Sequence, residues 1–202
     1  MSLKTTTRLF VFLFVVACIP IMSHANDSKK PSVSSNKEVV EFLGINFGIS
    51  YSELKEVLKN SKNNMTFNEK KSNKINNERK SKGSTDYFYQ GNHRLNGAQE
   101  TLYAFWEDKL ISIVVQFESM EAKDIYETLK YKIENKYGEL EDKITSNGVE
   151  SSLIANGLYL MLFYDEEPNE KGVVTFVGIH MGLHASKRKK KTEKKRDSLG
   201  EL

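Results

Sequence analysis

Cysteine is nearly absent from this chain: Cys18 is the only one among 202 residues. A single cysteine cannot close an intrachain disulfide, so the fold must be stabilised by an apolar core, which about 150 residues can supply. If Cys18 is removed with a leader segment, thiolate zinc sites and catalytic cysteines are excluded as well.

Sequence motifs of familiar catalytic chemistry are also lacking. The chain has no Gly-x-Ser-x-Gly, no phosphate-binding loop and no dinucleotide-binding fingerprint. The acidic run Asp165, Glu166 and Glu167 lacks the spacing of a calcium-binding loop and is more typical of solvated turn charges. Because catalytic triads assemble from residues far apart in sequence, an enzyme is not excluded, but no pattern favours one. We predict no cofactor.

Histidine offers the one candidate for a metal site. Outside the leader the chain has His93, His180 and His184, and the last two lie four residues apart near the end of a predicted strand. With a third ligand such as a carboxylate they would hold a divalent metal, which gives the alternative of a hydrolase or metal-dependent enzyme. Histidines at a frayed strand end are the simpler interpretation, and His93 is typical of a loop.

Only one long hydrophobic run is present, from Leu9 to Met22, and basic residues precede it. Its fourteen residues fall short of the about 20 that a membrane-spanning helix needs. Ser23-His24-Ala25 then supplies a small-x-small cleavage site. We therefore predict a signal peptide over residues 1–25 and an exported, periplasmic or secreted protein that begins at Asn26.

The same segment contains a second cleavage signal. Val15-Val16-Ala17-Cys18 resembles the lipobox of bacterial lipoproteins, in which the cysteine is lipidated after a cut directly before it. Cleavage there leaves an outer-membrane lipoprotein anchored at Cys18, whereas cleavage after Ala25 leaves a soluble protein. We favour the soluble form, because Ile19 and Ile21 prolong the apolar stretch beyond Cys18.

Charge is divided unevenly along the chain. The net charge is +3, to which residues 1–25 contribute +2 and residues 187–202 contribute +5, so residues 26–186 carry −4. A tail this rich in like charges and poor in apolar residues is typical of disorder, and we predict a basic disordered tail over 186–202. Its basic residues are Lys187, Arg188, Lys189, Lys190, Lys191, Lys194, Lys195 and Arg196.

These basic residues predict contact with an anionic surface, such as lipid phosphate or an acidic glycan. Each Lys or Arg near an anionic membrane contributes about 1 kcal/mol. Nucleic acid is disfavoured as a partner, because the Lys- and Asn-rich residues 60–86 lack interleaved aromatics. A tail that only improves solubility is the alternative.

The mature chain begins with residues that lack hydrophobic periodicity. Residues 26–38 are predicted to be a disordered linker, followed by a single α+β domain over 39–185. Within that domain, residues 60–86 are so polar that they predict an edge strand near 65–69 and a long exposed loop.

Two helices are predicted in the domain. Ser50-x-x-Glu53 is a capping box before an apolar stripe, which predicts a helix over 50–60. Apolar residues at four-residue spacing predict a second helix over 121–137. Strands are predicted at 39–48, 87–89, 102–106, 110–117, 153–155, 158–164 and 173–181.

These elements predict an α+β fold with one antiparallel sheet and two helices packed on one of its faces. A helix followed by about three strands occurs twice, which suggests a duplicated α-β-β-β unit. Leu102-Tyr103 and Leu158-Tyr159, each followed by an aromatic pair, fit a duplication. Strand propensity selecting similar residues twice accounts for them equally well.

Two segments resemble a known family. Phe47-Gly48-Ile49-Ser50 leads into the first helix, and Phe105-Trp106-Glu107-Asp108-Lys109-Leu110 precedes a strand. In these features the chain resembles the small exported bacterial domains of the BamE (SmpA/OmlA) type of envelope lipoprotein. The resemblance implies an envelope location and an assembly role. Because the helix at 121–137 departs from that family's single-unit pattern, we carry over no functional residues.

The patterns together predict an exported, non-enzymatic binding protein associated with the cell envelope. Its basic tail would contact an anionic surface, and an unknown envelope protein would meet the sheet or an aromatic cluster formed by Tyr87, Tyr89, Tyr103 and Trp106. The alternatives are the metal-dependent enzyme that uses His180 and His184 and a lipid-anchored envelope assembly protein.

Overall fold

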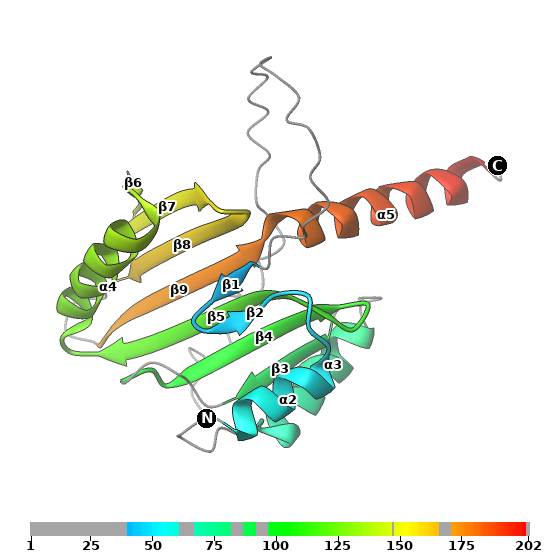
Figure 1. Cartoon of the computed structure of the whole chain (residues 1–202), viewed down its shortest axis with the longest axis horizontal. Helices are drawn as coiled ribbons and strands as arrows, with labels where there is room; N and C mark the ends of the chain where they lie inside the picture. The colour runs from blue at the N-terminus through cyan, green and yellow to red at the C-terminus, as the bar shows by residue number, and fades with distance from the viewer. Residues whose placement is uncertain are drawn as a thin grey trace, which may run out of the picture. The chain divides into compact units, whose positions relative to one another are not determined.

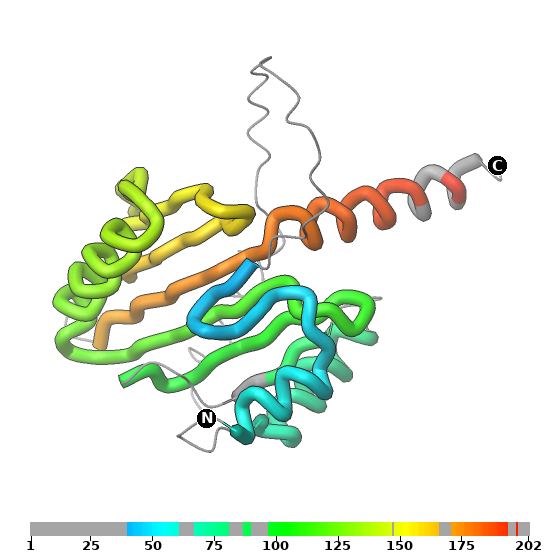
Figure 2. Tube along the Cα trace, in the orientation of Figure 1, coloured from blue at the N-terminus to red at the C-terminus, as the bar shows by residue number. Residues whose placement is uncertain are grey.

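The computed structural model describes residues 40–60, 67–81, 87–91, 97–146, 148–165 and 171–200, all of which belong to one compact unit, Glu38–Leu202. Figure 2 traces the chain along its Cα atoms, with most of these residues in colour. The predicted signal peptide and linker, both cleavage sites at Cys18 and Ala25, His93 and the pair Glu166 and Glu167 lie outside the described residues.

Strands and helices alternate along the described chain. The helices are α2 Tyr51–Lys59, α3 Glu69–Ser81, α4 Ala122–Tyr137 and α5 Met181–Gly200. The strands are β1 Glu41–Phe42, β2 Ile45–Asn46, β3 Tyr87–Gly91, β4 Glu100–Trp106, β5 Lys109–Ser119, β6 Glu141–Ile144, β7 Gly148–Ala155, β8 Leu158–Asp165 and β9 Gly172–His180.

Strands β3 to β9 form one antiparallel sheet in the order β3-β4-β5-β9-β8-β7-β6, while β1 and β2 form a separate hairpin. The pairing of β5 with β9 joins the two halves of the sheet. α2 precedes β3 to β5 in one half, and α4 precedes β7 to β9 in the other (Figure 1). The predicted α+β fold is confirmed. Each half has the element order of the predicted α-β-β-β unit, with α3 and β6 added.

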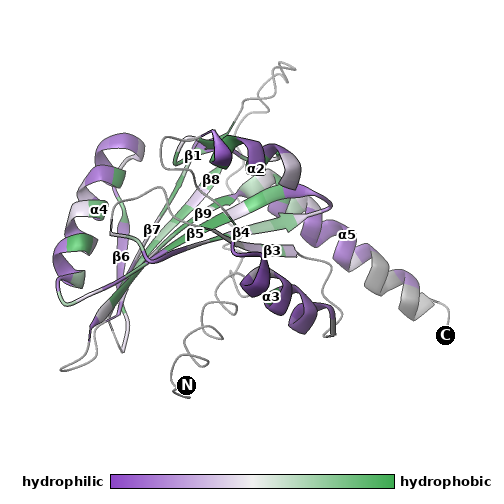
Figure 3. Ribbon diagram, turned by 90° about the horizontal axis from the view of Figure 1, so that it is seen from below, coloured by the Kyte–Doolittle hydropathy of each residue, from purple (hydrophilic) through white to green (hydrophobic). Residues whose placement is uncertain are grey.

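α2 and α4 lie on the same face of the sheet, as Figure 3 shows. The start of α2 is held by the predicted capping box: the Glu53 N–H donates to Ser50 Oγ at 3.3 Å, and the Ser50 N–H donates to the Glu53 carboxylate at 2.6 Å. Leu54 and Leu58 of α2 are buried in the core beneath it. The capping box and the apolar stripe of the sequence therefore correctly predict where α2 begins and that Leu54 and Leu58 are buried.

The β1–β2 hairpin packs on the centre of that same face. The ring of Phe42 lies edge-on to the ring of Phe176 in β9, with centroids 4.8 Å apart. A Cβ placed on Gly178 would come within 2.7 Å of Phe42 Cδ1. The absence of a side chain at Gly178 is thus what lets the hairpin approach the sheet.

Helix α3 replaces the long loop that the sequence predicted in this region. The helix has no apolar stripe, because Ile75 is its one buried apolar residue among the described side chains. Asn68 caps its start by accepting the Lys71 N–H on Oδ1 at 3.0 Å. Asn68 followed by Glu69 is a sequence signal for the start of this helix. The polar composition of the segment favoured a loop instead, so the helix was not predicted.

Side chains on one flank attach α3 to the edge strand β3. Asn76 Oδ1 accepts the N–H of Phe88 at 2.7 Å, and the Arg79 guanidinium lies 4.0 Å from the centre of the Phe88 ring. Figure 3 shows α3 on the opposite side of the sheet from α2 and α4. The amide of an edge strand is therefore satisfied by a helix side chain.

Helix α5 occupies most of the region in which composition predicted a disordered tail from residue 186. Lys, Arg and Glu have high intrinsic helix propensity, and the first turn is held by the sheet, so the cost of starting a helix is offset by tertiary contacts. Figure 1 shows α5 running beyond the end of the strands. Lys194, Lys195 and Arg196 continue the helix, although their side chains are outside the described ones.

Candidate functional site on the C-terminal helix

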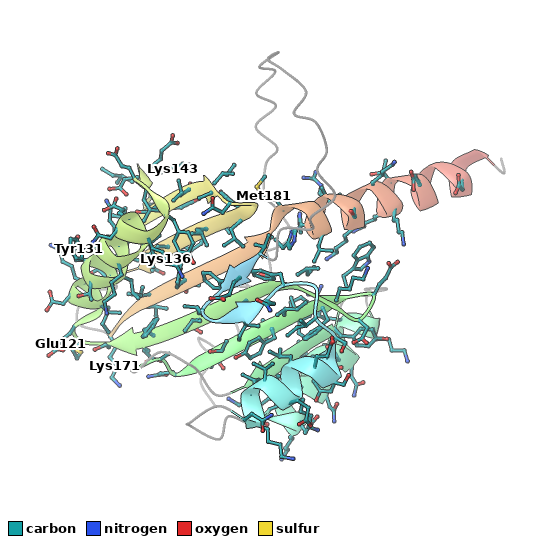
Figure 4. All side chains as sticks on the ribbon, in the orientation of Figure 1. Glu121, Tyr131, Lys136, Lys143, Lys171 and Met181 are labelled. Atoms are coloured by element: carbon teal, nitrogen blue, oxygen red, sulfur yellow. The ribbon has the colours of Figure 1, made fainter. Side chains whose placement is uncertain are left out.

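Helix α5 begins directly at the end of β9, without an intervening loop. His180 is the last residue of β9 and Met181 is the first of α5, and Figure 4 labels Met181 at this junction. The Met181 N–H donates to the Gly157 carbonyl of the β7–β8 turn at 2.9 Å. The Leu183 N–H donates to His180 Nδ1 at 3.4 Å. These bonds set the direction in which α5 leaves the sheet.

His180 serves as the N-cap of α5. Its ring also lies edge-on to Phe47, with centroids 5.9 Å apart, and burial lowers the pKa of the imidazole below its ordinary value. His184 lies one turn further along the helix. In the part of the chain that the structure describes, no group of three or more His, Cys, Asp or Glu is arranged to hold a metal ion. Of the two predicted metal ligands, His180 thus caps the start of α5 and His184 lies within the helix.

Leu183 fixes the first turn of α5 to the hydrophobic core. Its Cδ1 lies only 3.7 Å from the position that a Cβ on Gly48 would take. Gly48 has a φ of +83°, which glycine adopts without strain, in the link between β2 and α2. The start of α5 therefore contacts residues from the opposite end of the described chain.

Lys190 makes the second attachment of α5 to the sheet. Its Nζ donates to both carboxylate oxygens of Glu107, at 3.1 and 2.9 Å, and lies 5.3 Å from the ring centre of Trp106. The side chains of Lys190 and Glu107 are 56% and 50% exposed. An exposed ion pair contributes about 0.2–1 kcal/mol, and an exposed cation–π contact adds about 0.5–1 kcal/mol. This attachment is therefore weak.

The turn between β4 and β5 has an unusual backbone. Glu107 and Asp108 have φ values of +49° and +53°, a left-handed conformation for which such turns normally use Asn and Gly. Each acidic side chain holds a helix: Glu107 binds Lys190, and Asp108 Oδ1 accepts the Tyr51 N–H at the start of α2 at 3.0 Å. The turn thus connects the first and last helices of the described chain.

The middle of α5 presents basic side chains to solvent. Arg188, Lys189 and Lys191 are exposed, whereas Lys187 is half-buried. Lys189 is 80% exposed, and its Nζ lies 4.0 Å from the Glu193 carboxylate one turn on. We define the α5 basic surface as Arg188, Lys189, Lys190 and Lys191.

The predicted aromatic cluster is divided by the sheet. Tyr89 pairs with Tyr103 across β3 and β4, on the face that carries α2, and the Tyr89 ring stacks on Tyr51 with centroids 3.9 Å apart. Trp106 follows Phe105 in β4 and therefore points to the opposite face. Burial, followed by the hydrogen bond to Glu69, raises the pKa of Tyr51 to about 12. Tyr89 and Tyr103 belong to a packed layer, Tyr87 is 52% exposed, and Trp106 belongs to the α5 site.

A polar cluster that sequence patterns did not indicate joins α4 to β6 and β7. Lys130 donates to Asp142, Ser151 Oγ donates to the same carboxylate at 2.5 Å, and the Tyr126 hydroxyl lies 2.5 Å from Ser151 Oγ. Burial opposes ionisation of Asp142, but the hydrogen bonds from Lys130 and Ser151 hold its pKa below the ordinary value. Because Ser151 is fully buried, this cluster stabilises packing and offers no hydroxyl to a substrate.

In comparisons with known proteins, no family model, no curated protein and no solved structure matches this chain. Among the described residues, no helix combines the length and apolar character needed to cross a membrane. The α5 basic surface is the feature with the clearest chemical preference, which is for anions.

Proposed function

We propose that this chain is an exported, non-enzymatic binding protein that attaches to an anionic membrane surface through helix α5. The observation that supports it most is the exposure of the α5 basic surface on a helix whose described contacts with the sheet lie within residues 181–190. The predicted signal peptide would deliver the protein to the periplasm or the outside of the cell, where phospholipid headgroups supply the anions.

The number of cations suits a surface with closely spaced negative charges. Each of the four residues of the α5 basic surface would contribute about 1 kcal/mol near an anionic bilayer. Electrostatic attraction decays over about 8 Å at physiological ionic strength, so attachment would weaken strongly as salt is added.

The remainder of the mature chain would orient the protein on the bilayer. Residues 26–186 carry a net charge of −4, so an anionic membrane repels them while it attracts α5. A helix of 20 residues is about 30 Å long, and Lys190 lies at its middle. The α5 basic surface therefore lies about 10–15 Å along the helix from its junction with β9, which lets it meet a membrane while most of the sheet stays away from it.

The test compares vesicle binding of the wild-type chain and a variant with Arg188→Gln, Lys189→Gln and Lys191→Gln. Sedimentation with vesicles of phosphatidylglycerol and phosphatidylcholine should show an affinity about 100-fold lower for the variant, because three cations of about 1 kcal/mol each are lost. Vesicles of phosphatidylcholine alone should bind neither protein.

A matched control removes the same charge from elsewhere on the domain. Lys123 and Lys132 of α4 and Lys143 of β6 are exposed, and Lys143 is labelled in Figure 4. The triple change of these three to Gln should leave vesicle binding nearly unchanged. If both triple variants lost the same vesicle affinity, binding would depend on net charge and not on helix α5, which would contradict the proposal. If the wild-type chain bound heparin but not vesicles, the partner would be an acidic glycan and not a membrane.

A further inference from the structure

The carboxylate of Glu107 occupies the place that an anionic ligand would take at Lys190. Both of its oxygens lie within hydrogen-bond distance of Lys190 Nζ, and the indole ring of Trp106 lies beside the same ammonium. Lys189 is paired with Glu193 of its own helix, whereas the anion at Lys190 comes from a turn 83 residues away in sequence.

We propose that Lys190 and Trp106 form a subsite for a lipid phosphate, which Glu107 occupies in the free protein as an internal anion. This inference rests on the proposed function. When Arg188, Lys189 and Lys191 contact a bilayer, the phosphates nearby reach a high effective concentration at Lys190. A phosphate oxygen then replaces the Glu107 carboxylate on Nζ, and no covalent bond changes.

The contact of Lys190 with Glu107 and Trp106 is weak enough for an external anion to displace the Glu107 carboxylate. An exposed ion pair with an exposed cation–π contact shifts a docking equilibrium by roughly tenfold. The partly exposed Lys190 and Glu107 fit that range. A pair fully buried in the core would resist exchange, because separating its charges would leave each one unpaired.

Exchange would also change the surroundings of Trp106. Its side chain is only 8% exposed while Lys190 is docked. Tryptophan favours the headgroup region of a bilayer, since its ring is apolar and its N–H is polar. Replacement of Glu107 by a lipid phosphate would therefore bring Trp106 next to the headgroups as a second favourable group at the contact.

The backbone of the turn supports a role for Glu107 beyond joining two strands. A left-handed φ of +49° disfavours a residue with a side chain. Glycine or asparagine would relieve that strain but would not supply the carboxylate. Strain of this kind persists where a contact depends on it.

Trp106 is the only tryptophan in the chain, so its fluorescence reports on this subsite in the unlabelled full-length protein. The measurements are acrylamide quenching of Trp106 and affinity for phosphatidylglycerol vesicles. The variants are Glu107→Gln, with Glu141→Gln as its charge-matched control on the exposed edge strand β6, and Lys190→Gln, with Lys191→Gln as its control.

In the free protein, Glu107→Gln and Lys190→Gln should both increase quenching of Trp106, and the two controls should not. Glu107→Gln should bind vesicles about two- to fivefold more tightly than the wild type, because the internal competitor is weakened. Lys190→Gln and Lys191→Gln should both bind vesicles more weakly, because each removes a cation of the α5 basic surface, so the quenching of Trp106 is what separates the two. Vesicles should alter the quenching of wild-type Trp106, while inorganic phosphate alone should leave it unchanged.

Equal vesicle affinity of the wild type and Glu107→Gln, with Trp106 quenching unaffected by vesicles, would overturn the subsite and leave the proposed function intact. Absence of vesicle binding by the wild type would overturn both. A response of Trp106 to inorganic phosphate equal to the response to vesicles would overturn the assignment of the anion to a lipid.

Discussion

Helices α4 and α5 are both rich in lysine, but they pack differently. α4 lies along the sheet and buries Tyr126 and Ile133 in the core. α5 touches the sheet through its cap, Leu183 and Lys190, and its second half extends beyond the strands (Figure 1). A helix that packs along its whole length stabilises the hydrophobic core. A helix that contacts the sheet near one end leaves its exposed basic side chains accessible to an anionic partner.

The charges of the two helices differ in the same way. α4 has four lysines and three acidic residues, and its Lys130 is paired with Asp142. α5 has eight basic and two acidic residues. Because the basic residues of α5 outnumber its acidic ones so strongly, they must find anions elsewhere, first on Glu107 and then, in our proposal, on a membrane.

The largest expected loss of stability comes from the core contact of α4. Ile133→Ala should lower the free energy of unfolding by about 2–5 kcal/mol, because it removes a buried side chain and leaves a cavity. Tyr131→Ala is the control on the same helix, since Tyr131 is 69% exposed, and should change it by less than about 0.5 kcal/mol. Urea denaturation measures the free energy of unfolding of both variants. Equal losses in Ile133→Ala and Tyr131→Ala would contradict the packing of α4 along the sheet.

A smaller loss is expected from the polar cluster under α4. Ser151→Ala removes a buried hydroxyl and leaves the Tyr126 hydroxyl without its partner, so the free energy of unfolding should fall by about 1–3 kcal/mol. The exposed Ser146 provides the control Ser146→Ala. If Ser151→Ala left the free energy of unfolding unchanged, the ion pair of Asp142 and Lys130 would attach β6 to α4 without the serine.

The smallest effect concerns the pH dependence of the junction between β9 and α5. Burial lowers the pKa of His180 in the folded state, so the unfolded state binds more protons as the pH falls below about 6.5, the ordinary value of histidine. The contribution of neutral His180 is therefore present above that pH and is lost as the pH falls toward the folded pKa. His180→Asn keeps a capping side chain but does not titrate.

The free energy of unfolding of the wild type minus that of His180→Asn, measured from pH 8 to pH 5, should decrease toward low pH. A difference that stays constant across this range would show that protonation of His180 does not affect the start of α5.

Local patterns were sufficient to predict the elements that pack on the core. The Ser50 capping box and the apolar stripe of α4 predicted two helices, and period-two alternation predicted β5, because burial on one face leaves that signature in sequence. A run that is apolar on both faces predicted β8. The polar helix α3 escaped prediction, since it is held by Asn76 and Arg79 on the edge strand and buries little.

The candidate site was predicted only in part. Composition identified the basic residues of α5 and their preference for anions, but it predicted disorder where the structure has a helix. The contact of Lys190 with Glu107 left no sequence signal, because it joins two exposed side chains far apart in the chain. The left-handed turn at Glu107 and Asp108 was likewise hidden, since neither residue is typical of that conformation.

The most direct test of the account is binding of phosphatidylglycerol vesicles by the full chain and by a chain that ends at Ala185, which keeps the His180 cap and the Leu183 contact. The free energy of unfolding of the shortened chain should be lower than that of the full chain by about 1–2 kcal/mol, because the ion pair and the cation–π contact of Lys190 are lost, and the shortened chain should no longer bind vesicles. A shortened chain that is equally stable and binds vesicles as tightly as the full chain would contradict the role of α5.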